Sequence, residues 1–175
     1  MIRYNKFPLE VPTFKFALTE GLDDRFLPTK GEPFATGWDV KSASFENIIV
    51  SPGEYFKIPL GFRAFPPEGW WFNLHPRSSS FTKKYMHNLI GIIDEHYANE
   101  VIFAGQYIPS TNSIKQDPHS VMNNLIIKYG DSIGQIVPIK RVEMKIDRIS
   151  NEEYDDLCKQ RVAIRSGGFG STDIK

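Results

Sequence analysis

The sequence has few of the features that mark secreted or membrane-bound proteins. It contains one cysteine, Cys158, among 175 residues, so no internal disulfide framework forms and a reducing compartment is expected. No apolar run approaches the length that spans a bilayer, and the N-terminus lacks the apolar core of a signal peptide. We therefore expect a cytoplasmic protein without membrane contact, and we interpret Cys158 as an ordinary thiol.

An excess of charge of either sign is also lacking. Lysine plus arginine and aspartate plus glutamate number 21 each, so the formal net charge is zero. Because broad DNA or RNA binding needs many cations, we expect no nucleic-acid partner, whereas a compact phosphate site needs only a few. The four histidines, His75, His87, His96 and His119, lack the spacing of metal ligands, so no protein-ligated zinc site is expected.

Helical patterns are scarce, whereas short aromatic and β-branched segments recur along the chain. Turn residues such as Pro52-Gly53 and Gly130-Asp131 separate these segments. Many short strands at close spacing are typical of a sandwich or barrel, so we predict an all-β domain over residues 1–160. The predicted strands are 14–18, 45–50, 54–65, 70–75, 100–108, 125–129, 133–141 and 142–149, with a further apolar strand before Asp94.

Two short helices are expected. One covers 78–86, with Ser78 or Ser79 as its cap. The other begins at Ser150, which acidic residues follow, as is typical of a helix start. The polar segment 109–123 connects two strands, and connections of this length often carry function.

The chain closes with a segment that has no means of packing a core. Residues 161–175 contain three glycines, Gly167, Gly168 and Gly170, which bring no side chain and lose much freedom on ordering. We predict a flexible C-terminal arm, which is either a remnant or a segment whose backbone approaches a ligand closely.

Four sites contain residue types suited to phosphate chemistry. In "PRSSS", Arg77 and neighbouring hydroxyls suit an anion, although a helix cap is the alternative. Asp94 follows an apolar strand and is placed to act as a general base, or to make a turn. Gln135 lies inside an apolar strand and needs a hydrogen-bond partner, while Asp39 follows a glycine and is either a ligand or a turn residue.

Taken in order, these segments resemble the five motifs of the homotrimeric dUTP nucleotidohydrolases, the dUTPases. The motifs are "TGWDV", "PRSS", "NLIGIIDEHY", "GDSIGQIV" and "RSGGFGST", between Ala35 and Thr172. The resemblance implies a distorted jelly-roll or β-barrel of the β-clip type and a trimer with active sites at subunit interfaces. It also implies hydrolysis of dUTP to dUMP and pyrophosphate, with Mg²⁺ held mainly by the substrate phosphates.

The resemblance also assigns roles to residues. Asp94 would activate the water that attacks the α-phosphorus, and Gln135 would support the α-phosphate. Asn88 and the main chain around Gly91 and Ile93 would read uracil, and Tyr97 would pack against deoxyribose. The other implied substrate residues are Arg77, Ser78, Ser79, Arg165, Phe169, Gly170, Ser171 and Thr172, with Phe169 stacking on uracil and Asp39 reaching the Mg²⁺ through water.

The match departs from the family in several places, among them Asn99 after the third motif and Asp173 in the tail. Ser79 stands where the family usually has glycine, and the tail has one residue fewer before the paired glycines, so Arg161 is an alternative to Arg165 as the arm's phosphate ligand. Segment 109–123 is longer than usual and is a candidate docking loop for a regulatory partner. Two other functions stay open: a dCTP deaminase of the same fold, and a binding module without catalysis.

Overall fold

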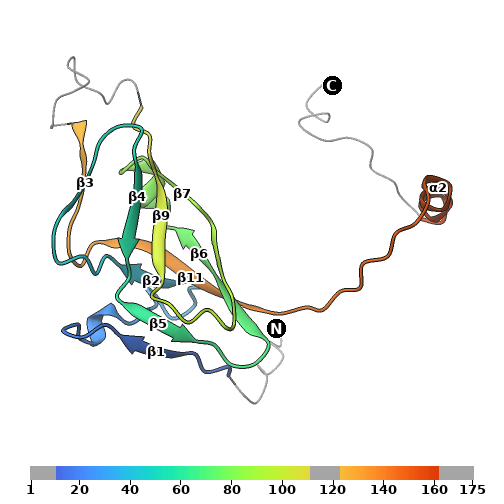
Figure 1. The fold of residues 1–175 in the computed structure, drawn as a ribbon, viewed down its shortest axis with the longest axis horizontal. Coiled ribbons are helices and arrows are strands. Elements are labelled where there is room, and N and C mark those ends of the chain that lie inside the picture. The colour runs from blue at the N-terminus through green and yellow to red at the C-terminus, as the bar shows by residue number, and fades with distance from the viewer. Residues whose placement is uncertain (1–10, 111–122, 162–175) are drawn as a thin grey trace, which may run out of the picture. The chain divides into compact units, whose positions relative to one another are not determined.

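The structure, a computed structural model, describes residues 11–110 and 123–161 of the chain. The chain divides into two compact units, the first ending at Arg141 and the second beginning at Val142. The first unit is built almost entirely of β-strands, so the predicted all-β class is confirmed (Figure 1). Within the described ranges, no helix is long and apolar enough to cross a membrane.

The strands of the first unit are three to nine residues long and pair in antiparallel fashion. Two short helical segments interrupt them: the 3-10 turn η1 (Asp24–Phe26) and helix α1 (Ser78–Thr82). The strands are β1 (Lys15–Leu18), β2 (Trp38–Lys41), β3 (Ile48–Val50), β4 (Tyr55–Pro59), β5 (Phe62–Phe65), β6 (Trp70–Pro76), β7 (Met86–Asn88), β8 (Gly91–Ile93), β9 (Ile102–Tyr107), β10 (Leu125–Ile127) and β11 (Ser132–Lys140).

Two sheets form the body of this unit. One has the order β2-β11-β6-β8 and the other the order β4-β9-β7, while β1 pairs with β5 and β10 with β3. In Figure 1, β4, β9 and β7 run side by side and β11 passes across them. Strands β7 and β8 follow each other in the chain, yet each is the edge strand of a different sheet.

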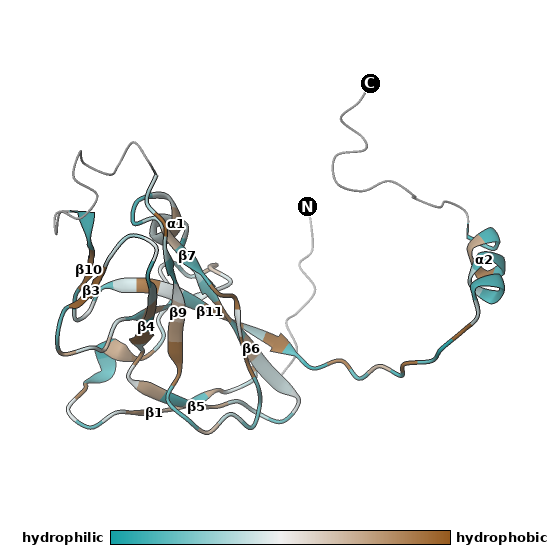
Figure 2. Ribbon diagram, turned by 45° about the horizontal axis from the view of Figure 1, so that its top comes forward, coloured by the Kyte–Doolittle hydropathy of each residue, from teal (hydrophilic) through white to brown (hydrophobic). Residues whose placement is uncertain are grey.

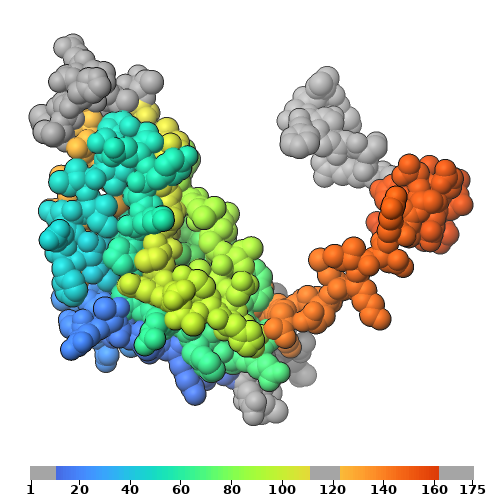
Figure 3. Space-filling model, viewed as in Figure 1, coloured from blue at the N-terminus to red at the C-terminus, as the bar shows by residue number. Residues whose placement is uncertain are grey.

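The core lies between these sheets and follows the alternation of the strands. Along β6, Phe72 and Leu74 are buried, whereas Asn73 and His75 face the other side of the sheet and are half-buried. Brown apolar segments alternate with teal ones along the strands in Figure 2, and Figure 3 shows teal β4 packed against yellow β9. The largest fully buried side chains are Phe26, Phe62, Phe72, Phe103, Ile58, Leu60, Leu74, Met86, Ile127, Ile133, Val40 and Val101.

Two of the predicted elements are corrected in detail. The segment 54–65 forms two strands, because Gly61 adopts φ of +74° between them and a side chain there would meet Leu22 and Ala43. Helix α1 is present, but neither serine caps it: Arg77 occupies the N-cap position and makes no capping hydrogen bond.

In the second unit, α2 (Asn151–Lys159) begins where the sequence predicted. The Ser150 hydroxyl accepts a hydrogen bond from the Glu153 N–H. The strand predicted over 142–149 is wrong for the single chain, since this segment pairs with no strand among the described residues. Its alternating apolar side chains are exposed instead: Val142, Met144 and Ile146 at 84%, 80% and 86%.

Candidate functional site

The four-stranded sheet brings together segments that are far apart in the sequence. Asp39 on β2 and His75 on β6 are the cross-strand partners of Gln135 on the central strand β11. Cross-strand partners share one face of a sheet, so the three residues form a polar row on the side away from the core. The sheet order β2-β11-β6-β8 therefore places the first, fourth, second and third sequence motifs on, or directly after, consecutive strands.

Two further contacts fix one end of this polar row. The Nε of Arg77, directly after β6, lies 3.4 Å from Oδ1 of Asp39. The Gln135 carboxamide donates from Nε2 to the Pro76 carbonyl at 3.4 Å. Gly37 leaves space for this carboxamide, because a Cβ there would lie 2.4 Å from its Oε1. A guanidinium, a carboxylate and an amide thus lie together at one end of the sheet.

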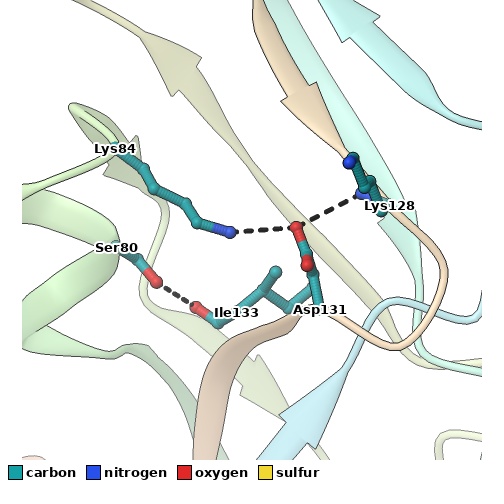
Figure 4. Close-up of polar contacts among 5 residues, drawn as sticks. All are labelled: Ser80, Lys84, Lys128, Asp131 and Ile133. Carbon is teal, nitrogen blue, oxygen red and sulfur yellow. Dashed lines mark hydrogen bonds and ion pairs between the residues drawn. The ribbon is translucent and has the colours of Figure 1, made fainter.

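Helix α1 starts at this same end. Ser78 is exposed and Ser79 is half-buried, whereas Ser80 is buried and donates from its hydroxyl to the Ile133 carbonyl at 2.7 Å. Figure 4 shows this contact beside the ion pair of Lys84 with Asp131, whose atoms are 3.0 Å apart. The helix is therefore attached to β11 through Ser80, and the segment directly after the helix is attached through Lys84 to Asp131, the residue before β11.

The connection from β7 to β8 carries Asn88, the amide predicted to bind the uracil ring. Both polar atoms of the Asn88 side chain are buried and have no hydrogen-bond partner among the described residues. Asn88, Leu89 and Ile90 line a groove of about 640 Å³ together with Pro76 and Phe81. Gly91 follows in β8, and the Ile93 side chain packs against the core, so only the backbone of Ile93 is available to a ligand.

The turn after β8 contains two carboxylates in different surroundings. Asp94 is exposed, and among the described residues no group donates a hydrogen bond to its carboxylate. Glu95 instead accepts from the Gly69 N–H at 3.0 Å and from Arg141 at 2.7 Å. Tyr97 closes the turn, its N–H donating to the Asp94 carbonyl at 3.1 Å and its hydroxyl to the Glu100 carbonyl at 3.2 Å.

Asp94 lies at the opposite end of the sheet from Arg77. Ile93 pairs with Phe72, so the next residue, Asp94, is level with Trp71 on β6. Trp71 and Arg77 are separated by six residue steps, which at the usual rise of a strand is about 20 Å. In one chain, the predicted phosphate ligand Arg77 and the predicted general base Asp94 therefore lie far apart.

Several predicted residues lie outside the described part of the chain. These are Arg165, Phe169, Gly170, Ser171 and Thr172 of the arm, and most of the loop 109–123. Arg161 is described and exposed; its backbone N–H donates to the Cys158 carbonyl at 3.0 Å. No cluster of three or more histidine, cysteine or acidic residues suited to a metal occurs among residues 11–110 and 123–161.

The sequence did not indicate two residues that the structure places at this site. His75 joins the polar row through the pairing of β6 with β11, and only the strand register reveals it. Ser80 looked like one more hydroxyl of a serine run, although it alone of the three is fully buried.

Comparison with known proteins identifies the family. No protein-family model matches the chain. The deoxyuridine 5'-triphosphate nucleotidohydrolase of Thermobifida fusca is 31% identical over 83% of this chain and 72% of its own length. The enzyme of the same name from Candida albicans is also 31% identical, over 83% and 80%. The chain belongs to the dUTPase family. The resemblance drawn from the five motifs is thereby confirmed.

Solved structures of dUTPases share the fold of this family member. A variant of the Staphylococcus bacteriophage 80alpha dUTPase, with dUpNHpp, aligns with a TM-score of 0.68 at 18% identity, over 91% of this chain and 98% of the phage protein. The dUTPase of phage phi11 of S. aureus, described with a structural Mg(II) ion, gives 0.64 at 21% identity, over 79% and 97%. The predicted jelly-roll fold is confirmed.

Proposed function

We propose that the protein hydrolyses dUTP to dUMP and pyrophosphate, at sites that combine residues of different chains. The observation that carries the proposal is the sheet order β2-β11-β6-β8, which unites segments from four of the five family motifs on one sheet. Membership of the dUTPase family and the names of the relatives support the substrate.

The end of the sheet that carries Arg77 suits the triphosphate. Arg77 supplies a permanent charge, Ser78 an exposed hydroxyl, and Gln135 an amide that would contact the α-phosphate. Asp39 provides one partly exposed carboxylate, which fits a Mg²⁺ that is held mainly by phosphates and waters, as Mg²⁺ often is. When bound, the ion would neutralise phosphate charge.

The connection between β7 and β8 suits the uracil base. The Asn88 amide lacks partners within the described chain, and buried polar groups normally have one, so a uracil edge is a fitting partner. As edge strands of separate sheets, β7 and β8 each have an edge without a neighbouring strand in their sheet, which leaves main-chain groups near Gly91 and Ile93 to read the base. Cytosine presents a donor where uracil presents an acceptor, and such a mismatch is rejected strongly.

Asp94 suits the role of general base. Its carboxylate is exposed in the turn that follows β8 and receives no hydrogen bond from described residues, so it can hold a water. As the water oxygen forms its bond to the α-phosphorus, the Asp94 carboxylate would take the water's proton. The bond from that phosphorus to the oxygen that bridges to the β-phosphorus would break, and pyrophosphate would leave. Tyr97, three residues further, would pack against deoxyribose and exclude a 2′-hydroxyl.

The distance between the two groups of residues indicates more than one chain per site. Because Arg77 and Asp94 lie about 20 Å apart along the sheet, we infer that Asp94 of one subunit meets Arg77 of another within a homotrimer. The exposed apolar row of 142–149 fits burial against a neighbouring subunit. The arm would then contribute Arg165, or Arg161, and Phe169 to close over the nucleotide.

The test is product analysis with purified protein. Pyrophosphate release is measured from dUTP, dCTP, dTTP and UTP with and without Mg²⁺, and ammonia release is measured from dCTP. Pyrophosphate released from dUTP, and from none of the other nucleotides, supports the proposal. Ammonia released from dCTP would instead reveal a deaminase, and tight dUTP binding without turnover would reveal a binding module. A deaminase of this fold would need a catalytic glutamate on the strand that follows the turn. The acid nearest to that position is Glu100, whose carboxylate instead accepts a hydrogen bond from the Gly61 N–H at 2.8 Å.

A further inference from the structure

Strand β11 contains an irregularity two residues before Gln135. Its register against β2 shifts between Ser132 and Gly134, which makes Ile133 the extra residue of a β-bulge. A bulge takes one residue out of the regular ladder and redirects the strand that follows it. The direction of the Gln135 side chain therefore depends on how this bulge is held.

Ser80 holds the bulge. Its hydroxyl donates to the Ile133 carbonyl at 2.7 Å, and the residue is only 1% exposed. A buried carbonyl outside a strand ladder needs a donor, and here the donor comes from α1. The contact joins two segments 53 positions apart, the one after Arg77 and the one before Gln135.

An ion pair makes a second tie between the same two segments. Nζ of Lys84 lies 3.0 Å from Oδ2 of Asp131, with 34% and 30% of the two side chains exposed. The same carboxylate oxygen accepts the Lys128 N–H at 3.2 Å, which fixes the turn that leads into β11 (Figure 4). Asp131 thus links the turn before β11 to the segment that follows α1.

We propose that Ser80, together with the Lys84–Asp131 pair, is a positioning clamp that sets Arg77 against Gln135. Helix α1 has five residues and no capping side chain, so it is too short to be stable without tertiary contacts. The two ties supply such contacts: Ser80 joins the helix to the bulge, and Lys84 joins the segment after the helix to Asp131, directly before β11. This inference deepens the proposed function and rests on it, because the clamp acts through the phosphate-binding residues.

The experiment compares Ser80→Ala, Lys84→Met and the double variant with two matched controls. Thr82→Ala removes a hydroxyl contact inside α1, from Thr82 to the Ser78 carbonyl at 2.9 Å, and Lys83→Met removes the neighbouring exposed lysine. We expect kcat/KM for dUTP to fall about tenfold in each clamp variant, as for a misplaced binding group, and to stay within about twofold in the controls. The double variant should lose less than the product of the single losses, because both ties hold one unit.

Binding separates positioning from general loss of structure. The dissociation constant for a non-hydrolysable dUTP analogue should rise about tenfold in the clamp variants, while that for deoxyuridine, which has no phosphate, stays unchanged. Equal losses for both ligands, or no loss for the analogue, would overturn the clamp. Lys84→Met, at a half-exposed position, keeps the test valid if Ser80→Ala does not fold. Wild-type protein that releases no pyrophosphate from dUTP would instead overturn the proposed function.

Discussion

At the scale of single residues, neighbouring side chains of one motif do different work. In the segment after β8, the Glu95 carboxylate is bound by Arg141 and by the Gly69 N–H, whereas the Asp94 carboxylate is exposed and accepts no hydrogen bond from the described residues. An ion pair of this kind stabilises the fold, and a carboxylate without protein partners is available to a water.

The first prediction concerns this difference. Asp94→Asn keeps the shape of the side chain but removes its basicity, so dUTP should bind with unchanged affinity while kcat falls by about a thousandfold. Glu95→Gln, the matched control, should lower the melting temperature and leave kcat within a few-fold. Steady-state kinetics and calorimetric binding of dUTP check both variants, and a fast Asp94→Asn enzyme would remove Asp94 from the mechanism.

A second prediction follows from the space at Gly37. A methyl group there would lie 2.4 Å from Oε1 of Gln135, so Gly37→Ala should push the carboxamide away from the Pro76 carbonyl. We expect kcat/KM for dUTP to fall about a hundredfold, as for a displaced catalytic group. Gly31→Ala is the control, because its new methyl would lie 3.8 Å from Asp39, an ordinary contact. Equal kinetics of the two variants would refute the role of Gln135.

A third prediction concerns the choice of sugar. Tyr97→Ala should raise UTP hydrolysis relative to dUTP, because the ring no longer fills the place of a 2′-hydroxyl. Tyr97→Phe removes only the hydrogen bond to the Glu100 carbonyl and should keep the preference for dUTP. The ratio of kcat/KM for the two nucleotides checks this, and an unchanged ratio in Tyr97→Ala excludes the ring from sugar selection.

At the scale of elements, the sequence predicted most strands because apolar and β-branched residues alternate in them. It missed β2 and β7, short segments that become strands only through their partners β11 and β9. It predicted a strand over 142–149 because apolar and polar residues alternate there. A strand must pair with a second strand, and the described part of the same chain provides none for this segment. The local sequence pattern therefore indicates whether a segment tends to form a strand, whereas its pairing depends on residues far away in the sequence.

The candidate site shows the same limit. Asp94, Arg77 and Gln135 stand in segments whose composition already indicated chemistry. The polar row with His75 depends on the register of β6 against β11, and the role of Ser80 depends on a bulge. Neither feature follows from spacing within one segment.

A fourth prediction concerns α2, whose first turn is stabilised by polar contacts. Hydrogen bonds from its own backbone N–H and from Ser150 hold the pKa of Glu152 below its ordinary value. Because the pKa of Glu152 is lowered in the folded helix, its ionised carboxylate stabilises the helix fully at neutral pH. This stabilisation is lost as the pH falls through the folded-state pKa of Glu152. Ser150→Ala should reduce the ratio of helix to coil roughly fivefold, as loss of a cap does. Backbone carbon chemical shifts of 151–159 check it at neutral and acidic pH.

At the scale of the whole molecule, one chain is an incomplete enzyme in this account. The proposed phosphate ligand Arg77 and the proposed general base Asp94 lie at opposite ends of one sheet, about 20 Å apart along the strand direction. Three apolar side chains of the second unit, Val142, Met144 and Ile146, are more than three-quarters exposed in the single chain. A symmetric assembly buries such surfaces and brings opposite ends of neighbouring subunits together.

Subunit mixing tests this division of the site most directly. Asp94→Asn and Arg77→Ala should each be inactive alone, because every site then lacks one group. Unfolded together in equal amounts and refolded, they should recover about a quarter of wild-type dUTP hydrolysis, since random assortment gives that share of sites both intact residues. Mixtures as inactive as the separate variants would contradict a site built from two chains.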